Sequence, residues 1–442
     1  MLPTLIAVGQ LGRIHPDEVY QWLEPAWYRA HGYGVLAWEW QVGLRNWATP
    51  GVAAGLLRLA SVLGLTHPVA YRALLALPQL LLHGWMLGAA FRFAERRVGR
   101  GGGLLALLAV GLYGPVLVFA GRTLGESLSA SFLGVALEAL DRREDTRRAG
   151  LVGGLALGLA VVARYGSAVM VLAALVWLVA ARRWRTLGFT CLAGLGVALA
   201  LGALDAATWG QPFHSLRAYV DFNVLSGQAA ARFGASPPSF YVAPLLAALP
   251  LWSWAAVPLG WRAWRQRPGL SLPGWCAAVY VLALLATPHK EERFLYPGLV
   301  LFVLAAAPQV AGFVGGLGEA GASRVGALGL LATTLLAGAR YPSEDLRADQ
   351  FRAIVAATRA PSVRGLLIVN EGLWGAGGFF YLGKNIPWLT CDWPQDANFQ
   401  AAVRDARFNR AVTFEGRALE ALEAAGFRVV ERVGRETVLA RD

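Results

Sequence analysis

The charged stretch His289-Lys290-Glu291-Glu292-Arg293 runs directly into FLYPGLVLFVLAAAPQVAGF at 294–313, a segment without a charged side chain. As an α-helix, a segment of this length rises about 30 Å, which is the thickness of the hydrocarbon core of a bilayer. Ionisable groups at such a boundary are costly unless they bind something or pair with one another. The stretch therefore predicts a membrane span with a functional cluster at one end.

Comparable apolar segments recur through the chain, which has 442 residues, is 56% hydrophobic and 15% charged, and has a mean hydropathy of +0.47. This composition indicates an α-helical polytopic membrane protein. Together with a short stub at 1–11, the segments predict about eleven transmembrane helices, at 68–91, 103–121, 124–140, 150–163, 166–181, 187–204, 241–261, 273–287, 294–313 and 325–339.

The net charge of +12 follows the membrane and does not indicate nucleic acid. Residues 341–442 carry 13 basic and 13 acidic side chains, so the excess lies in residues 1–340. Of the 27 basic residues there, 15 lie in five short loops, the bias typical of cytoplasmic loops; these are 92–100, 141–149, 182–186, 262–267 and 318–324. Alternation of the spans then places the first loop, the 205–240 loop, His289 to Arg293 and the C-terminal region on the opposite side.

The first loop, 13–67, begins with His15-Pro16-Asp17-Glu18. Apolar residues from Val19 to Ala30 recur at helical spacing, which predicts an amphipathic helix lying at the membrane interface. Pro25 removes a backbone donor, so we expect a kink just before it.

From about residue 341 the composition becomes that of a small soluble domain. The pattern predicts helices at 343–357, 396–406 and 417–425, strands at 365–369, 386–390 and 411–414, and a hairpin at 427–440 around Gly434. We therefore divide the chain into a transmembrane catalytic domain, 1–340, and an extracytoplasmic α/β domain, 341–442.

Several of these motifs resemble glycosyltransferase family 22, the polyprenyl-phosphate-mannose-dependent mannosyltransferases of the GT-C superfamily. The resemblance covers residues 13–340 and rests on His15-Pro16-Asp17-Glu18, Glu24-Pro25-Ala26, Tyr33-Gly34, Trp38-Glu39-Trp40, Leu44-Arg45, Arg122-Thr123, Phe222-Asn223, Phe233-Gly234, Tyr241 and His289 to Pro297. The sequence departs from the family pattern at Ala37, where Thr is common, and at Gly125-Glu126, where a Ser-Asn pair is common.

The resemblance implies a GT-C fold and transfer of a hexose, with mannose favoured, from a polyprenyl-phosphate donor. Asp17 is the candidate general base for the acceptor hydroxyl, in a single displacement with inversion. The alternative is that Asp17 only caps a helix. Glu18 is a second catalytic candidate that could equally stabilise the helix start, and His15 could simply hydrogen-bond the loop.

His289, Lys290 and Arg293 are the candidate clamp for the donor phosphate, with Arg122 as a further cation. Snorkelling at the interface is the alternative for this cluster. Trp38, Glu39, Trp40 and Arg45 are acceptor or loop candidates, although aromatic residues at this depth are often membrane anchors. The spacing of His, Cys and acidic residues predicts no metal site, and a divalent ion held by carboxylates and phosphate stays open.

The resulting hypothesis is an integral membrane mannosyltransferase. The arginine- and glycine-rich composition favours a bacterial inner membrane, with the active site facing the periplasm, over the alternative of the endoplasmic reticulum. Its partners would be a polyprenyl-phosphate sugar, a lipid-linked or glycan acceptor and membrane lipids. Two alternatives stay open. A GT-C enzyme could move another sugar or use a protein or cell-wall acceptor, and a lipid-linked-sugar flippase would place polar residues along a path between helices.

Overall fold

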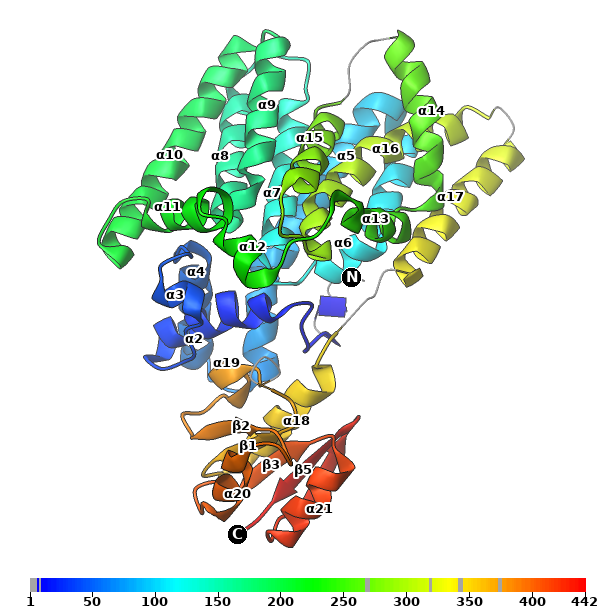
Figure 1. Ribbon diagram of the computed structural model, residues 1–442. Helices are drawn as coiled ribbons and strands as arrows, with labels where there is room; N and C mark the ends of the chain where they lie inside the picture. Colours follow the sequence, from blue (N-terminus) through cyan, green and yellow to red (C-terminus); the bar gives the residue numbers. More distant parts are fainter. Residues whose placement is uncertain (1–5, 8, 267–270, 318–319, 341–344, 373–375) are drawn as a thin grey trace. The chain divides into compact units, whose positions relative to one another are not determined.

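The computed structural model describes residues 6–7, 9–266, 271–317, 320–340, 345–372 and 376–442 (Figure 1). The chain forms two compact units. The helical unit comprises Met1–Ile6, Val42–Ala48 and Leu77–Ser343. The mixed unit comprises Ala7–Gln41, Thr49–Ala76 and Glu344–Asp442. Each is described here by itself.

The helical unit contains most of the apolar segments. The segments predicted from 68 onward are mainly helical, but 103–121 is interrupted at 112–113 and 241–261 at 249–250. Its helices are α5 (Pro68–Gly111, from residue 77 onward), α6 (Gly114–Phe119), α7 (Gly125–Leu140), α8 (Arg147–Ala163), α9 (Ala168–Ala180), α10 (Trp184–Trp209), α11 (His214–Val220), α12 (Gln228–Phe233), α13 (Val242–Ala248), α14 (Leu251–Gln266), α15 (Leu272–Ala286), α16 (Tyr296–Gly315) and α17 (Ala320–Arg340). Two predicted spans, 68–91 and 103–121, are joined through α5, whose helical path is broken at Gly99.

Among the described residues, three helices are long and apolar enough to cross a membrane, namely Pro68–Gly111, Trp184–Trp209 and Glu292–Gly315. Pro238–Ala248 and Leu251–Leu259 form a fourth candidate that bends by 106°. Shorter apolar helices lie at Ala48–Val62, Tyr165–Ala180, Leu272–Ala286 and Gly321–Ala337. The chain is therefore a helical integral membrane protein.

Helix α16 lies at the centre of its unit. Other parts of the chain bury 72% of its apolar window, against 17% for α10, and it packs on α7, α14, α15 and α17. Helices α8 and α10 also pack closely against each other, because α8 has glycines four residues apart where it meets α10. A Cβ at Gly150 or Gly154 would collide with the backbone of Thr186 or Thr190. Small residues at this spacing are typical of packed membrane helices.

The mixed unit combines the first loop with the C-terminal region. The loop forms a π-helix η1 (Glu18–Leu23), α2 (Glu24–His31), α3 (Trp38–Gln41) and α4 (Ala48–Val62). The C-terminal region forms α18 (Ala348–Arg359), β1 (Leu366–Val369), α19 (Gly378–Leu382), β2 (Trp388–Cys391), α20 (Ala397–Arg404), β3 (Arg410–Thr413), α21 (Gly416–Ala424), β4 (Arg428–Val433) and β5 (Glu436–Ala440). These elements match the predicted order, with α19 added.

The strand order of the sheet is β2-β1-β3-β5-β4, with β1 parallel to β2 and to β3 and the other pairs antiparallel. Side chains alternate across a strand. Accordingly Leu366 and Ile368 belong to one core, while Leu367 and Val369 belong to another with Phe399 and Leu439; the second core is covered by α20 and α21.

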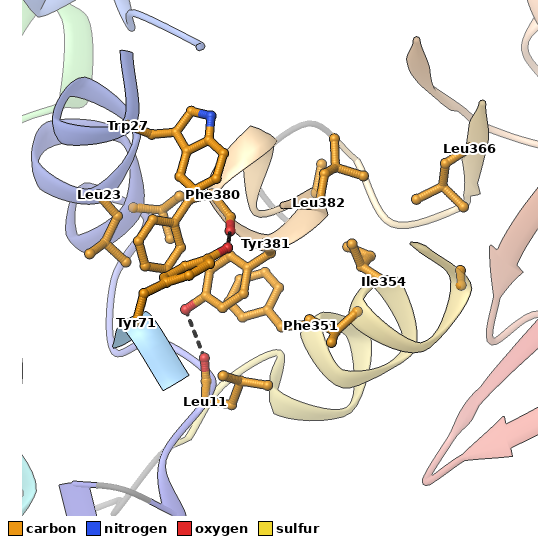
Figure 2. Packing of buried hydrophobic residues seen from close by; sticks show 14 of the residues in the cluster. Leu11, Leu23, Trp27, Tyr71, Phe351, Ile354, Leu366, Phe380, Tyr381 and Leu382 are labelled. Atoms are coloured by element: carbon orange, nitrogen blue, oxygen red, sulfur yellow. Dashed lines mark hydrogen bonds between the residues drawn. The ribbon is translucent and has the colours of Figure 1, made fainter. Parts of the chain in front are cut away.

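The first of these cores also contains the first loop. Leu23 and Trp27 pack with Tyr71, Phe380 and Tyr381 in one cluster of buried side chains (Figure 2). The two segments that a division at residue 341 separates thus share one hydrophobic core, because the apolar faces of η1 and α2 are covered by protein.

This arrangement corrects the expected interfacial amphipathic helix. Every residue of η1 is buried, including Glu18 and Gln21 on its polar face. Periodicity identified the apolar side but not what covers it. The break before Pro25 takes the form of the π-helix, since Pro25 lacks the N–H that would bond to the carbonyl of Gln21.

Candidate functional site

Asp17 lies at the start of η1 with its side chain 18% exposed. Its Oδ1 lies 3.2 Å from Nδ1 of His15, and the same ring nitrogen lies 3.3 Å from the backbone N–H of Asp17. The Asp17 side chain makes no capping hydrogen bond to η1. Of the two readings of this carboxylate, the geometry does not support helix capping.

Glu18 lies in a different environment from its neighbour. Its side chain is fully buried, accepts a hydrogen bond from the backbone N–H of Ile14 at 3.2 Å, and pairs with Nη2 of Arg72 at 3.4 Å. These contacts of Glu18, with the loop backbone and with a guanidinium, hold the loop in place.

Arg72, in the first turns of α5, binds the chain just before Asp17. Its Nε donates to the carbonyl of Gln10 at 3.2 Å, and its Nη2 donates to the carbonyl of Gly12 at 3.0 Å as well as reaching Glu18. One guanidinium therefore bonds three points of the segment 10–18. Arginine suits this task because its donors form a rigid fork.

Tyr381 of α19 completes this support. Its hydroxyl donates to the carbonyl of Leu11 at 2.8 Å (Figure 2) and accepts from Nη1 of Arg72 at 2.7 Å. The hydroxyl of Tyr71 likewise donates to the carbonyl of Phe380. Sequence reasoning missed Arg72 and Tyr381, because each lies far along the chain from the loop that it holds.

Glu24 joins the two halves of the mixed unit. It is fully buried, and its carboxyl accepts hydrogen bonds from the backbone N–H groups of Val35 at 2.7 Å and Phe380 at 2.6 Å. A side chain at Gly378 would collide with this carboxyl. Burial raises the pKa of Glu24 to about 7, against the opposing effect of these backbone donors.

The remaining candidates of the first loop have mainly structural contacts. Trp40 is buried, and its indole N–H donates to the carbonyl of Tyr20 at 3.2 Å. Glu39 is also buried and accepts from the side-chain amide of Gln21 at 3.2 Å, while Trp38 is half-buried. Arg45 belongs to the helical unit, where its carbonyl accepts from the indole of Trp209.

The helical unit holds a polar network at the start of α16. Oε1 of Glu126 lies 3.3 Å from Nε of Arg164 and 3.4 Å from Nη1 of Arg293. Glu291 then bridges Arg293, at 2.6 Å, and Nε2 of His289, at 3.1 Å. Two carboxylates thus alternate with three cationic or ionisable donors.

Other contacts fix the walls of this network. Nη1 of Arg164 donates to the hydroxyl of Tyr280 at 2.9 Å, and that hydroxyl donates to the carbonyl of Phe294 at 2.9 Å. Nδ1 of His289 lies 3.2 Å from the carbonyl of Gly234. Tyr280 was missed because a tyrosine within an apolar span carries no distinguishing sequence signal.

Lys290 and Arg122 are both buried, at 6% and 1% exposure. The Lys290 ammonium donates to the carbonyl of Thr287 and lies 6.0 Å from the centre of the Tyr241 ring. Arg122 lies in the turn between α6 and α7, where its backbone N–H bonds to the carbonyl of Phe119. Burial of this kind differs from snorkelling, in which the charged head reaches water.

Comparison with known families decides the identity of this fold. Residues 4–339 match the Alg9-like mannosyltransferase family. The chain belongs to this family. The match includes the first loop and the network at His289 to Arg293.

Curated members of the Alg9-like family are similar to the chain at moderate identity. GPI mannosyltransferase 3 of Yarrowia lipolytica is 30% identical over 303 residues, which are 67% of this chain and 58% of that protein. The alpha-1,2-mannosyltransferase Alg9 of Drosophila melanogaster is 26% identical over 318 residues, 66% of this chain and 49% of that protein. The chain thus spans about half to three fifths of the length of these relatives.

Solved structures share the fold at low identity. ArnT from Cupriavidus metallidurans bound to undecaprenyl phosphate has a TM-score of 0.64 and 14% identity, over 99% of this chain and 96% of that chain. The Archaeoglobus fulgidus oligosaccharyltransferase has a TM-score of 0.51 and 11% identity, over 93% of this chain and 68% of that chain. Both are GT-C glycosyltransferases, so this Alg9-like chain has a GT-C type of fold.

Metal binding was left open by the sequence. Within the described ranges, no group of three or more His, Cys, Asp or Glu side chains lies close enough to hold an ion. Glu126 and Glu291 of the Alg9-like chain are instead paired with arginines. A divalent ion held by carboxylates together with a donor phosphate stays a prediction.

Proposed function

We propose that this chain transfers a hexose, in the first instance mannose, from a polyprenyl-phosphate donor to a lipid-linked or glycan acceptor with inversion. Membership of the Alg9-like mannosyltransferase family supports the reaction class. The observation that carries the mechanism is the Asp17 carboxylate, which lies 3.2 Å from the His15 ring and makes no capping bond to η1.

In this proposal Asp17 is the general base. It takes the proton of the acceptor hydroxyl while that oxygen forms a bond to the anomeric carbon. The bond from that carbon to the phosphate oxygen breaks, and the phosphate leaves with the electron pair. A carboxylate is suited to this role because it must carry the proton only as the new bond forms.

Lys290, Arg293 and His289 are assigned to the donor phosphate, with Arg122 as a further cation. Glu291 fixes Arg293 and His289 from one side, so that their other donors keep a defined direction. Preorganised donors stabilise charge that develops on the leaving group. No step is assigned to a metal.

Undecaprenyl phosphate is the ligand of the ArnT structure of the same fold, which supports a lipid-phosphate donor here. Glu18, by contrast, is assigned to holding the loop, since its buried carboxylate is engaged by Ile14 and Arg72.

For topology, we propose about eleven spans, with the mixed unit on the extracytoplasmic side of a bacterial inner membrane. The shared core of the first loop and residues 351–382 supports the placement of both on one side. A cysteine introduced at Gly416, in a chain whose native cysteines are replaced by alanine, should react with a membrane-impermeant maleimide in intact spheroplasts. A cysteine at Arg143 should react only after lysis, and the reverse pattern would overturn the proposed sidedness.

The test of function uses the purified chain in nanodiscs with radiolabelled polyprenyl-phosphate mannose and a lipid extract of the source organism. Asp17→Asn should abolish labelled product while donor binding is retained, because the change removes a base and little volume. Asp392→Asn, at an exposed site of the mixed unit, is the matched control.

Other outcomes separate the alternatives. Near-normal turnover by Asp17→Asn would refute the mechanism. Transfer of another sugar, or labelling of protein, would identify the alternative GT-C enzyme. Movement of the labelled lipid between leaflets without a new glycosidic bond would identify the flippase. Lys290→Ala should weaken donor binding as well as turnover.

A further inference from the structure

The carboxyl ends of β1 and β3 meet at a place where ligands commonly bind in α/β sheets. Strand β1 lies between β2 and β3 and is parallel to both. After β1 the chain first adds β2 on one side of β1 and later adds β3 on the opposite side. This reversal creates a topological switch point between β1 and β3. Crevices outside the carboxyl ends of strands at such points are the usual ligand sites of open α/β sheets.

A cavity of about 470 Å³ lies at this edge of the mixed unit. Glu371 follows β1, Phe414 follows β3, and Glu436 begins β5; Arg347, Asp349 and Gln350 come from the start of α18. This volume falls in the range of about 300–1,000 Å³ that holds small organic ligands. None of these residues has a role in the proposed transfer reaction.

Gln350 is the observation that points to a ligand. The residue lines the cavity and is only 1% exposed. Neither its Oε1 nor its Nε2 has a hydrogen-bond partner among the described residues. A buried amide left without partners destabilises the fold, because it has given up its hydrogen bonds to water and gained none in return. A leucine at this position would avoid that loss. The contacts within the fold therefore do not explain the amide, whereas a bound ligand that hydrogen-bonds to it would.

The carboxyls of Glu371 and Glu436 form a second polar feature in the same cavity. Both residues are buried, and the two side chains interact with each other. Burial, followed by this interaction with Glu371, raises the pKa of Glu436 above its ordinary value. Arg347 donates to Oε2 of Glu371, while Oε2 of Glu436 has no partner within the described part of the chain.

The rim combines apolar and charged groups. Phe414 is 42% exposed and Leu346 is 40% exposed, so an aromatic ring and an aliphatic side chain flank the buried polar floor. The backbone N–H of Arg435 donates to Oδ2 of Asp349 at 3.4 Å, which holds the β4–β5 turn against α18.

These features select a class of ligand. The acidic groups of the lining, four carboxyls against two guanidinium groups, disfavour phosphate and other anions. A buried amide, a pair of buried carboxyls and an arginine instead offer donors and acceptors side by side, which hydroxyl groups can match because each hydroxyl both donates and accepts. An exposed aromatic ring can pack on the apolar face of a pyranose.

We propose that this cavity is a saccharide-binding site that takes a mono- or disaccharide through Gln350, the Glu371–Glu436 pair and Phe414. That the saccharide is part of the acceptor glycan rests on the proposed transfer function. Binding of a free saccharide does not depend on that function and can be measured by itself.

The test titrates the full-length chain in nanodiscs with methyl α-D-mannopyranoside and with α-linked mannobiose, followed by saturation-transfer difference NMR. Saturable binding is expected for the wild type. Gln350→Leu should weaken it by about tenfold or more, since the ligand loses its buried amide partner. Glu420→Gln, at an exposed site on α21 outside the cavity, should bind as the wild type does.

A second readout separates binding from structure. Gln350→Leu should raise the thermal midpoint of the mixed unit while it lowers saccharide affinity, because it removes a buried amide that has no partner in the fold. A lowered midpoint together with unchanged saccharide binding would assign Gln350 to stability and overturn the proposal. Phe414→Ala, at a partly exposed position, should weaken binding without a loss of folded protein.

The outcomes also distinguish this site from the transfer reaction. Asp17→Asn should keep full saccharide binding while it loses transfer. Transfer that depends on Asp17 in a chain with no saccharide binding would overturn the site and leave the proposed function intact. Binding of magnesium or of an alkylammonium compound in competition with the mannoside would likewise overturn the assignment to saccharides.

Discussion

Replacing Arg72 by methionine should disable the chain chiefly through the position of Asp17. The change removes the bonds from the guanidinium to the carbonyls of Gln10 and Gly12, to Glu18 and to the hydroxyl of Tyr381. These bonds reach residues 10, 12, 18 and 381 and not Asp17, so the expected effect on Asp17 passes through the backbone of the loop.

The magnitude follows from what is left behind. Glu18 would stay buried with its cationic partner gone, and breaking a buried pair in this way costs about 3–5 kcal/mol. The loop can recover part of this energy by moving its carboxylate toward water. A displacement of about 1 Å at a catalytic group lowers turnover by about 100-fold. We therefore expect kcat to fall by about two orders of magnitude, with donor affinity changed by less than about threefold.

The assay compares kcat and donor dissociation constants on the monodisperse fraction in nanodiscs. Arg72→Lys should recover part of kcat, because an ammonium can still pair with Glu18 but cannot reach both carbonyls. Arg58→Met, at an exposed arginine of α4, is the control and should leave both values unchanged. If folded Arg72→Met keeps a normal kcat, the loop does not depend on this guanidinium and the reasoning is wrong. Tyr381→Phe, which loses only a hydroxyl, should have a smaller effect in the same direction.

Three further predictions test other parts of the structure. The folded pKa of Glu24, about 7, lies above its ordinary value of 4.5. The stability that Glu24 confers is therefore full below pH 4.5 and falls by about 3 kcal/mol as the pH rises through 7. Thermal midpoints measured between pH 4.5 and 8 should show this fall in the wild type and a flatter profile in Glu24→Gln. Glu126→Gln should bind polyprenyl phosphate about fivefold more tightly, because Arg293 is released from a neutralising carboxylate, and weaker binding in a direct lipid-phosphate titration would contradict this view. Gly154→Val should sharply reduce the yield of monodisperse protein on gel filtration, whereas Gly188→Val, where an added Cβ meets nothing within 4 Å, should not.

Local patterns predicted the elements of the fold well because each element carries its own period. The strands at 366–369 and 410–413 and the helices at 397–404 and 416–424 fall within a few residues of their predicted ranges. The short helix at 378–382 was missed, since five residues between glycines give no period to detect.

What the patterns could not supply was the partner of each apolar face. The helical spacing from Val19 onward is correct, yet membrane lipid and a protein core demand the same apolar stripe. The change of composition near residue 341 is also real, but composition is read along the chain, whereas the mixed unit is defined by contacts between distant segments.

The same limit applies to the candidate site. His289, Lys290 and Arg293 could be predicted together because they are neighbours in the sequence. Glu126, Arg164 and Tyr280 come from three other helices and join the network only in the folded chain. In the sequence Glu126 stands out as a departure from the family pattern, and its contacts with two arginines give that departure a physical meaning.

The need for the α/β segment follows from the size of the helices that it supports. η1 has six residues, α2 has eight and α3 has four, whereas isolated helices shorter than about 12–15 residues are marginal in water. Burial of η1 and α2 in the core that they share with α18 and α19 therefore has to provide the stability that their length does not, and α3 in turn bonds to η1 through Trp40 and Glu39. It follows that the position of Asp17 is encoded as much between Phe351 and Tyr381 as in the motif that contains it. A motif can identify a carboxylate, but only the fold identifies the residues that hold it.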